Sequence, residues 1–151
     1  MEEGEYKSTY NELASVRCVF EKALTHQQAK CHQAKHFWLA DREGYSCKSS
    51  ESSAICHELL ENLRKNSRFV LKVHDINGPL PHNMEIRVQV GGLRGLRQQL
   101  AAGEASAERV DNVQATVAQA LEKYGSLQNL PYSEIVQSVT QYQGRKRRQR
   151  D

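Results

Sequence analysis

The stretch MEIRVQVGGLRGLR, residues 84–97, decides the fold class because its pattern changes halfway along. Over residues 84–90, apolar side chains alternate with polar ones. A period of two is typical of a strand with one buried face. Gly91 and Gly92 end the alternation, and leucines at helical spacing follow from Leu93. The stretch therefore predicts a strand followed by a helix.

A second strand is predicted just upstream. Phe69, Leu71 and Val73 also alternate with polar residues, and the segment NGPLP (77–81) separates the two alternating runs. Its glycine accepts positive φ and its prolines cannot donate to a strand ladder, so pairing ends on both sides. We therefore expect a central two-stranded β-hairpin over residues 68–90.

The N-terminal third has a helical period. Between about Thr9 and Trp38, residues on one face recur mostly at steps of three and four: Leu13, Val16, Phe20, Ala23, Leu24, Gln27, Cys31, Ala34 and Trp38. This predicts a long helix. Thirty helical residues span about 45 Å, whereas a compact chain of this length has a radius of gyration of only about 15 Å. Such a helix would overhang the domain, so we expect a homodimer that covers it.

A second helix follows a polar break. Residues 46–53 contain Ser50, Ser52 and Ser53, whose hydroxyls are suited to cap a helix N-terminus. The helix then runs to about Asn66 with one apolar face, so it can lie antiparallel on the first helix. These segments predict a long helical hairpin over residues 9–66.

Helices are also predicted over residues 93–143. A short helix ends near Gly103, a second covers 107–124, and a third covers 130–143. The whole pattern predicts an α+β fold that is mainly α. It comprises the N-terminal helical hairpin, the central β-hairpin and the C-terminal helices, in one domain over residues 1–144.

The charge of the chain is concentrated at its C-terminus. The net charge is +3, but residues 145–151 carry +4, so residues 1–144 sum to −1. We expect this basic tail to be disordered when unbound, because it has no apolar anchor. Its basic residues are Arg145, Lys146, Arg147, Arg148 and Arg150.

The last two helices and the tail suggest contact with nucleic acid. The helices over 107–124 and 130–143 fit a helix-turn-helix, with Gln137, Ser138 and Gln141 expected to be exposed on the second. Glutamine can read base edges, and the tail can neutralise phosphates. This pattern favours a non-enzymatic regulatory or nucleic-acid-associated dimer. An ordinary helical hairpin with a solubilising tail, as in a protein–protein adaptor or assembly module, is the alternative.

All four cysteines and four of the six histidines lie between Cys18 and His57. Cys31 shares the apolar stripe of the first predicted helix, and Cys56 shares that of the second. We therefore expect both to be small core residues that approach each other if the two helices pack antiparallel.

Two of the histidines suggest a metal-binding or redox protein. His32 and His36 are one helical turn apart, the spacing at which a helix presents two imidazoles to one ion. His57 and Cys47 are the further ligands available for zinc or iron. No Cys-x-x-Cys pair accompanies them, so solvated histidines are the alternative.

The glycine cluster is a candidate anion site. Gly91 and Gly92, placed between a strand and a helix, would expose backbone N–H groups to an anion, and Arg94 and Arg97 would add charge. The alternative is that Gly-Gly merely provides a sharp turn.

Several classes of protein are not favoured. No apolar run approaches the roughly 20 residues needed to cross a bilayer, and the acidic N-terminus is unlike a signal peptide. Serine nucleophile elbows, Walker loops and dinucleotide fingerprints are absent from the sequence. We expect a cytoplasmic protein with reduced thiols and no membrane partner, and assign no catalytic residue.

Overall fold

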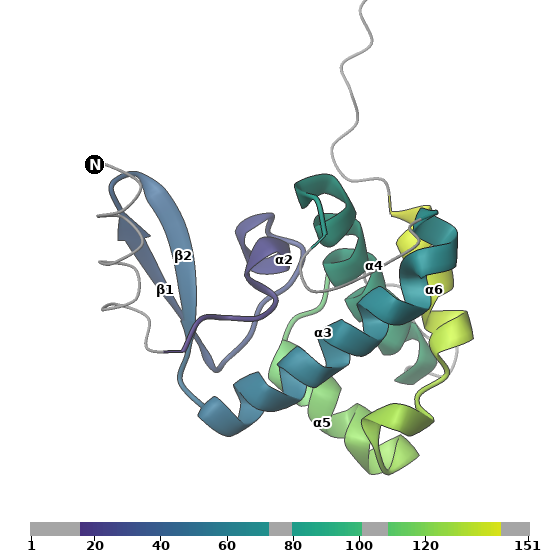
Figure 1. Cartoon of the computed structure of the whole chain (residues 1–151). Helices are drawn as coiled ribbons and strands as arrows, with labels where there is room; N and C mark the ends of the chain where they lie inside the picture. The colour runs from purple at the N-terminus through teal and green to yellow at the C-terminus, as the bar shows by residue number, and fades with distance from the viewer. Residues whose placement is uncertain (1–15, 73–79, 101–108, 143–151) are drawn as a thin grey trace, which may run out of the picture.

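The computed structural model describes residues 16–72, 80–100 and 109–142. In the described part, the two strands form an antiparallel hairpin at one side of the molecule and the helices gather at the other (Figure 1). This arrangement confirms an α+β fold that is mainly α. The elements in chain order are α2 (Glu21–Thr25), β1 (Ala34–Leu39), β2 (Arg42–Cys47), α3 (Ser50–Leu71), α4 (His82–Leu100), α5 (Val113–Tyr124), the 3₁₀ turn η1 (Leu127–Asn129) and α6 (Tyr132–Gln141).

Helix α4 is the centre of the helical group. It packs against α2, α3, α5 and, most extensively, α6. Nearly every residue from Glu85 to Leu96 is buried. The strand predicted over residues 84–90 is therefore wrong. A helix covered on most sides need not show a 3.6-residue polar face, and here burial among neighbouring helices outweighs the strand propensity of the β-branched residues.

The glycines of α4 allow α6 to approach closely. A Cβ atom on Gly91 would lie 2.5 Å from the Cα of Val139, and one on Gly95 would overlap the carbonyl group of Ile135. Gly91 and Gly92 are thus buried inside a helix, where their N–H groups belong to the helical ladder. The predicted strand-to-helix anion loop does not exist.

Helix α3 is longer than predicted. It begins as expected after the polar break, although the N-cap is Ser49, whose hydroxyl accepts a hydrogen bond from the Ser52 N–H at 3.2 Å. The helix continues through the predicted strand at Phe69 and ends at Leu71, with Lys72 as its C-cap in a left-handed conformation. The β-hairpin predicted over 68–90 is therefore wrong. Residues 73–79, which include most of its turn, lie outside the described residues.

The predicted helix over residues 9–38 is also wrong in its described part. The chain forms only the short helix α2 and then strand β1, which pairs with β2 from Ala34↔Cys47 to Leu39↔Arg42. Ala40 and Asp41 make the turn with φ values of 48° and 68°, the backbone of a two-residue hairpin loop. The described apolar residues that recur at steps of three and four belong to α2, to β1 and to the loops beside them, and not to one helix. The overhanging helix that motivated the homodimer prediction is thus not found here.

Helices α5 and α6 confirm the last two predicted helices in shortened form. Helix α6 packs on α4 and α3 through Ile135, Val136 and Val139. Gln137 and Gln141 are exposed as predicted, but Ser138 is buried, with 5% of its surface accessible. The basic tail, residues 145–151, lies outside the described residues.

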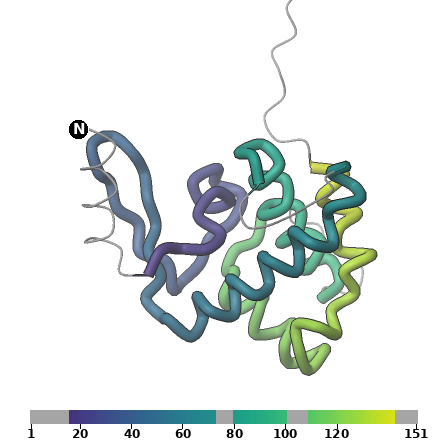
Figure 2. Tube along the Cα trace, in the orientation of Figure 1, coloured from purple at the N-terminus to yellow at the C-terminus, as the bar shows by residue number. Residues whose placement is uncertain are grey.

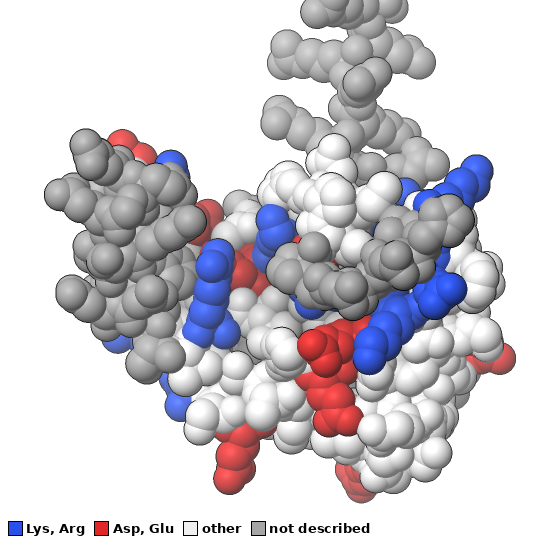
Figure 3. Space-filling view, viewed as in Figure 1, with Lys and Arg blue, Asp and Glu red and all other residues white. Residues whose placement is uncertain are grey.

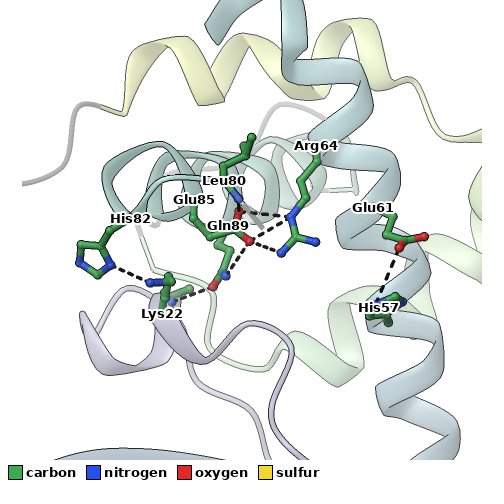
Figure 4. A network of polar contacts seen from close by, with 9 residues as sticks. Lys22, His57, Glu61, Arg64, Leu80, His82, Glu85 and Gln89 are labelled. Carbon is green, nitrogen blue, oxygen red and sulfur yellow. Dashed lines mark hydrogen bonds and ion pairs between the residues drawn. The ribbon is translucent and has the colours of Figure 1, made fainter. Parts of the chain in front are cut away.

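A buried ion pair joins three of the helices (Figure 4). The Arg64 Nε of α3 donates to Glu85 Oε1 of α4 at 3.0 Å. Glu85 also accepts from the Leu80 N–H at 3.3 Å and from the Gln89 side chain at 3.4 Å. Gln89 in turn accepts from the backbone N–H of Ala23 in α2 at 3.2 Å. One carboxylate therefore organises polar groups from α2, α3 and α4.

Candidate functional site

The fold gathers all four cysteines of the chain around one cavity. The cavity is small, with a volume of about 20 Å³, and it is open in part to solvent. Its thiols come from four separate pieces of structure: the loop before α2, the loop before β1, the end of β2, and the second turn of α3. All four are free. The cysteines that line the cavity are Cys18, Cys31, Cys47 and Cys56.

The cavity lies where the ends of several elements meet. Its walls include the start of β1 and the first turns of both α3 and α5. Much of the remaining lining is apolar, contributed by Val19, Phe20, Leu24, Ala34 and Val113. Because the N-terminus of a helix carries partial positive charge, two such ends beside the thiols favour negative charge in the cavity.

Backbone hydrogen bonds hold the cysteines in place. The Cys18 N–H donates to the Tyr45 carbonyl at 3.1 Å, and the Cys47 N–H donates to the Val16 carbonyl at 2.7 Å. These bonds attach the chain before α2 to the outer edge of β2. The Cys47 thiol donates to the Ser49 carbonyl at 3.1 Å, close to the start of α3. The hairpin therefore positions two of the four thiols.

Burial disfavours the thiolate form of two of the cysteines, Cys18 and Cys56. The pKa of Cys18 is raised to about 12, chiefly by burial and to a smaller degree by the neighbouring cysteines, while a hydrogen bond from the Phe20 backbone to the sulfur acts in the opposite direction. Burial likewise raises the pKa of Cys56 to about 12, with contributions from Cys31 and Cys47. At neutral pH these two groups would become thiolates only beside a compensating positive charge.

The thiols surround the cavity and do not meet at one point. Among the residues that the structure describes, no three His, Cys, Asp or Glu side chains lie close enough together to hold one metal ion. The cavity is thus lined by four potential ligands of one chemical type.

The histidines predicted to bind metal are not brought together. His32 lies in the loop before β1, and its Nδ1 is 3.0 Å from the Asn112 amide nitrogen. His36 lies on β1, not on a helix, and its Nε2 is 3.1 Å from Glu43 Oε1. His57 is exposed on α3. The helical pairing of His32 with His36 is therefore wrong, and Cys47 alone among the four predicted ligands lines the cavity.

The two arginines of the predicted anion loop have other contacts. Arg94 donates to the Gln28 side chain at 2.5 Å, and its guanidinium carbon lies 4.8 Å from the centre of the Tyr142 ring. Arg97 donates to the Arg109 carbonyl at 2.9 Å. Both side chains bind other parts of the chain, so no anion site forms around them.

The sequence contained a signal for this cavity that the helical interpretation missed. Assigning Cys31 and Cys56 to the core of a helical hairpin separated them from Cys18 and Cys47. The two residues do line the same cavity, but together with the other two cysteines. The concentration of all four cysteines in one third of the chain was the more informative observation.

Comparison with known proteins supplies no relative from which a function could be transferred. No protein-family model, curated protein or solved structure matches this chain. Within residues 16–72, 80–100 and 109–142, no helix has the length and apolar character needed to cross a membrane.

Proposed function

We propose that this is a metal-binding protein whose four cysteines hold an iron–sulfur cluster. The observation that supports this proposal is the convergence of every cysteine of the chain on one cavity. Four thiolates are the usual ligand set of [2Fe–2S] and [4Fe–4S] clusters, and also of structural zinc sites.

The lack of a three-ligand group among the described residues argues against a single ion. Zinc binds each thiolate sulfur at about 2.3 Å, so all four sulfurs must meet around one point. The described thiols do not satisfy that requirement. The ligands of a cluster bind different iron atoms, so they can stand farther apart around a shared cavity.

The raised pKa values of Cys18 and Cys56 argue against thiol catalysis in this cavity. A catalytic cysteine needs a low pKa, because the thiolate is the nucleophile. Burial raises the pKa of Cys18 and Cys56 instead. Bound iron would compensate the thiolate charge, and the Phe20 N–H and the two helix N-termini would stabilise it further. This function also requires reduced thiols, so we place the protein in the cytoplasm.

The test is the metal content of the full chain, purified without an affinity tag under anaerobic conditions. We expect iron and acid-labile sulfide in amounts close to one cluster for each chain, with visible absorption from thiolate-to-iron charge transfer. The variants Cys31→Ser and Cys56→Ser should each lose most of the iron.

The matched control is Ser53→Ala, which alters the lining of the same cavity without removing a thiol. It should retain its iron. Circular dichroism will show that all three variants fold. If the purified protein contains zinc and no sulfide, the four cysteines hold a zinc ion and not a cluster. The absence of any metal after reconstitution, or iron binding that is unaffected in both cysteine variants, would refute the proposal.

A further inference from the structure

The C-terminal half of α3 carries a basic and aromatic face that is independent of the cysteine cavity. Lys65, Arg68 and Phe69 are exposed at spacings of three and four residues on one side of the helix, and the exposed Lys72 is the residue that caps its C-terminus. Phe69 is 80% exposed. The Arg68 guanidinium carbon lies 5.1 Å from the centre of its ring. We call these four residues the basic–aromatic face.

The charges of this face are available to a partner. In the described part of the chain, no carboxylate lies within ion-pair distance of Lys65, Arg68 or Lys72. Arg64 differs, because it turns inward to Glu85 and contributes nothing to the surface. Figure 3 shows Lys and Arg side chains gathered over this half of α3, with acidic side chains over its middle.

Helix stability explains only part of this arrangement. Cations near a helix C-terminus interact favourably with the helix dipole, which accounts for Arg68 and Lys72. The dipole gives no reason for an aromatic ring among those charges that faces solvent with 80% of its surface. A flat apolar surface beside cations is instead typical of proteins that stack bases and bind phosphates.

We infer that the basic–aromatic face binds single-stranded nucleic acid. Lys65, Arg68 and Lys72 extend over about 10 Å of the helix axis and contact the phosphates, while Phe69 stacks on a base. A duplex hides the faces of its bases, so it offers phosphates alone to this surface. An acidic membrane would need several exposed apolar side chains, whereas Phe69 is the only large hydrophobic residue described on α3 that is fully exposed.

Helix α6 packs against α3, the helix that carries this face (Figures 1 and 2). Arg87 of α4 holds the C-terminal end of α6, because it donates to the Tyr142 carbonyl at 3.2 Å and to the Val139 carbonyl at 3.4 Å. The exposed Gln137 and Gln141 of α6 would lie near the bases of the bound strand.

The test is the fluorescence anisotropy of labelled oligonucleotides of mixed sequence, titrated with the full chain as purified. We expect binding to single-stranded DNA or RNA that weakens steeply as salt increases. The triple variant Lys65→Gln/Arg68→Gln/Lys72→Gln should bind at least about tenfold more weakly. Phe69→Leu, which keeps an apolar side chain but removes the ring, should weaken single-strand binding by about tenfold while leaving duplex binding unchanged.

The matched control is Lys30→Gln/Lys35→Gln/Lys48→Gln, which removes the same charge from exposed residues outside α3. It should retain most of the affinity. Equal losses in the two triple variants, or unchanged single-strand binding by Phe69→Leu, would overturn the inference. Binding to phosphatidylserine vesicles without binding to oligonucleotides would also overturn it and identify a membrane surface instead.

Discussion

At the scale of single residues, Glu85 is the most constrained charge in the described chain. It is 1% exposed, and its carboxylate accepts hydrogen bonds from Arg64, Leu80 and Gln89. A buried charge is tolerated only when its partners complete its hydrogen bonds. Removing one member of such a pair leaves the other buried and unpaired.

We predict that Glu85→Ala lowers the free energy of unfolding by about 3–5 kcal/mol, because Arg64 loses its buried counter-charge. The measurement is urea-induced unfolding followed by circular dichroism. The double variant Arg64→Met/Glu85→Met should recover most of this loss, since no buried charge remains. A loss below about 1 kcal/mol for Glu85→Ala would show that the pair is accessible to water.

At the scale of elements, the contact between α4 and α6 depends on glycines. A Cβ on Gly91 meets the backbone of α6, which cannot move without shifting the whole helix. A Cβ on Gly92 would lie 2.7 Å from the Leu63 Cδ1, at the far end of a side chain that can change rotamer. The two neighbouring glycines thus differ in what an added methyl group would meet.

We predict that Gly91→Ala destabilises the protein by about 1–3 kcal/mol or more, despite the higher helix propensity of alanine. Gly92→Ala is the matched control and should cost clearly less. Thermal unfolding of both variants provides the comparison. Equal stability of the two variants would mean that α6 adjusts its position freely.

Helix α4 shows why some elements were predicted correctly from the sequence and others were not. Helices α3, α5 and α6 each keep a solvated face, so their apolar residues recur at helical spacing and the sequence reveals them. In helix α4, apolar and polar residues alternate over residues 84–90, and burial among four other helices leaves little solvated surface, so this stretch resembles a strand. The true hairpin, β1 with β2, was missed because its turn uses Ala40 and Asp41 at positive φ without a glycine.

At the scale of the whole molecule, the cysteine cavity joins the hairpin to the helical group. Its walls include both strand ends, α2 and the first turns of α3 and α5. A centre bound by all four thiols would therefore cross-link segments that are distant in the sequence. Its removal would leave buried thiols whose charged forms are strongly disfavoured.

We predict that metal-free protein loses stability as pH rises above about 9. The pKa of the Cys18 and Cys56 thiols is about 12 in the folded chain, against an ordinary value of 9.0. A raised pKa stabilises the fold below the unfolded value, and this contribution disappears as pH rises toward the folded value. The measurement is the Tm of chelator-treated protein below and above pH 9.

Two comparisons isolate this effect from other alkaline titrations. The metal-free double variant Cys18→Ala/Cys56→Ala should show a smaller alkaline decrease in Tm. Metal-loaded protein should instead be most sensitive to acid, where protons displace the metal from the thiolates. Identical pH profiles for the metal-free wild-type and double-variant proteins would contradict the prediction.

The sequence by itself determined the mainly helical composition, the amphipathic helices α3, α5 and α6, and the concentration of cysteines in one third of the chain. These properties depend on local propensity and on one-sided burial, which leave a periodic pattern. Only the tertiary structure decided that residues 84–90 are helical, that Gly91 and Gly95 receive α6, and that four cysteines share one cavity. Each of these depends on contacts between residues far apart in the chain, and such contacts leave no period in the sequence.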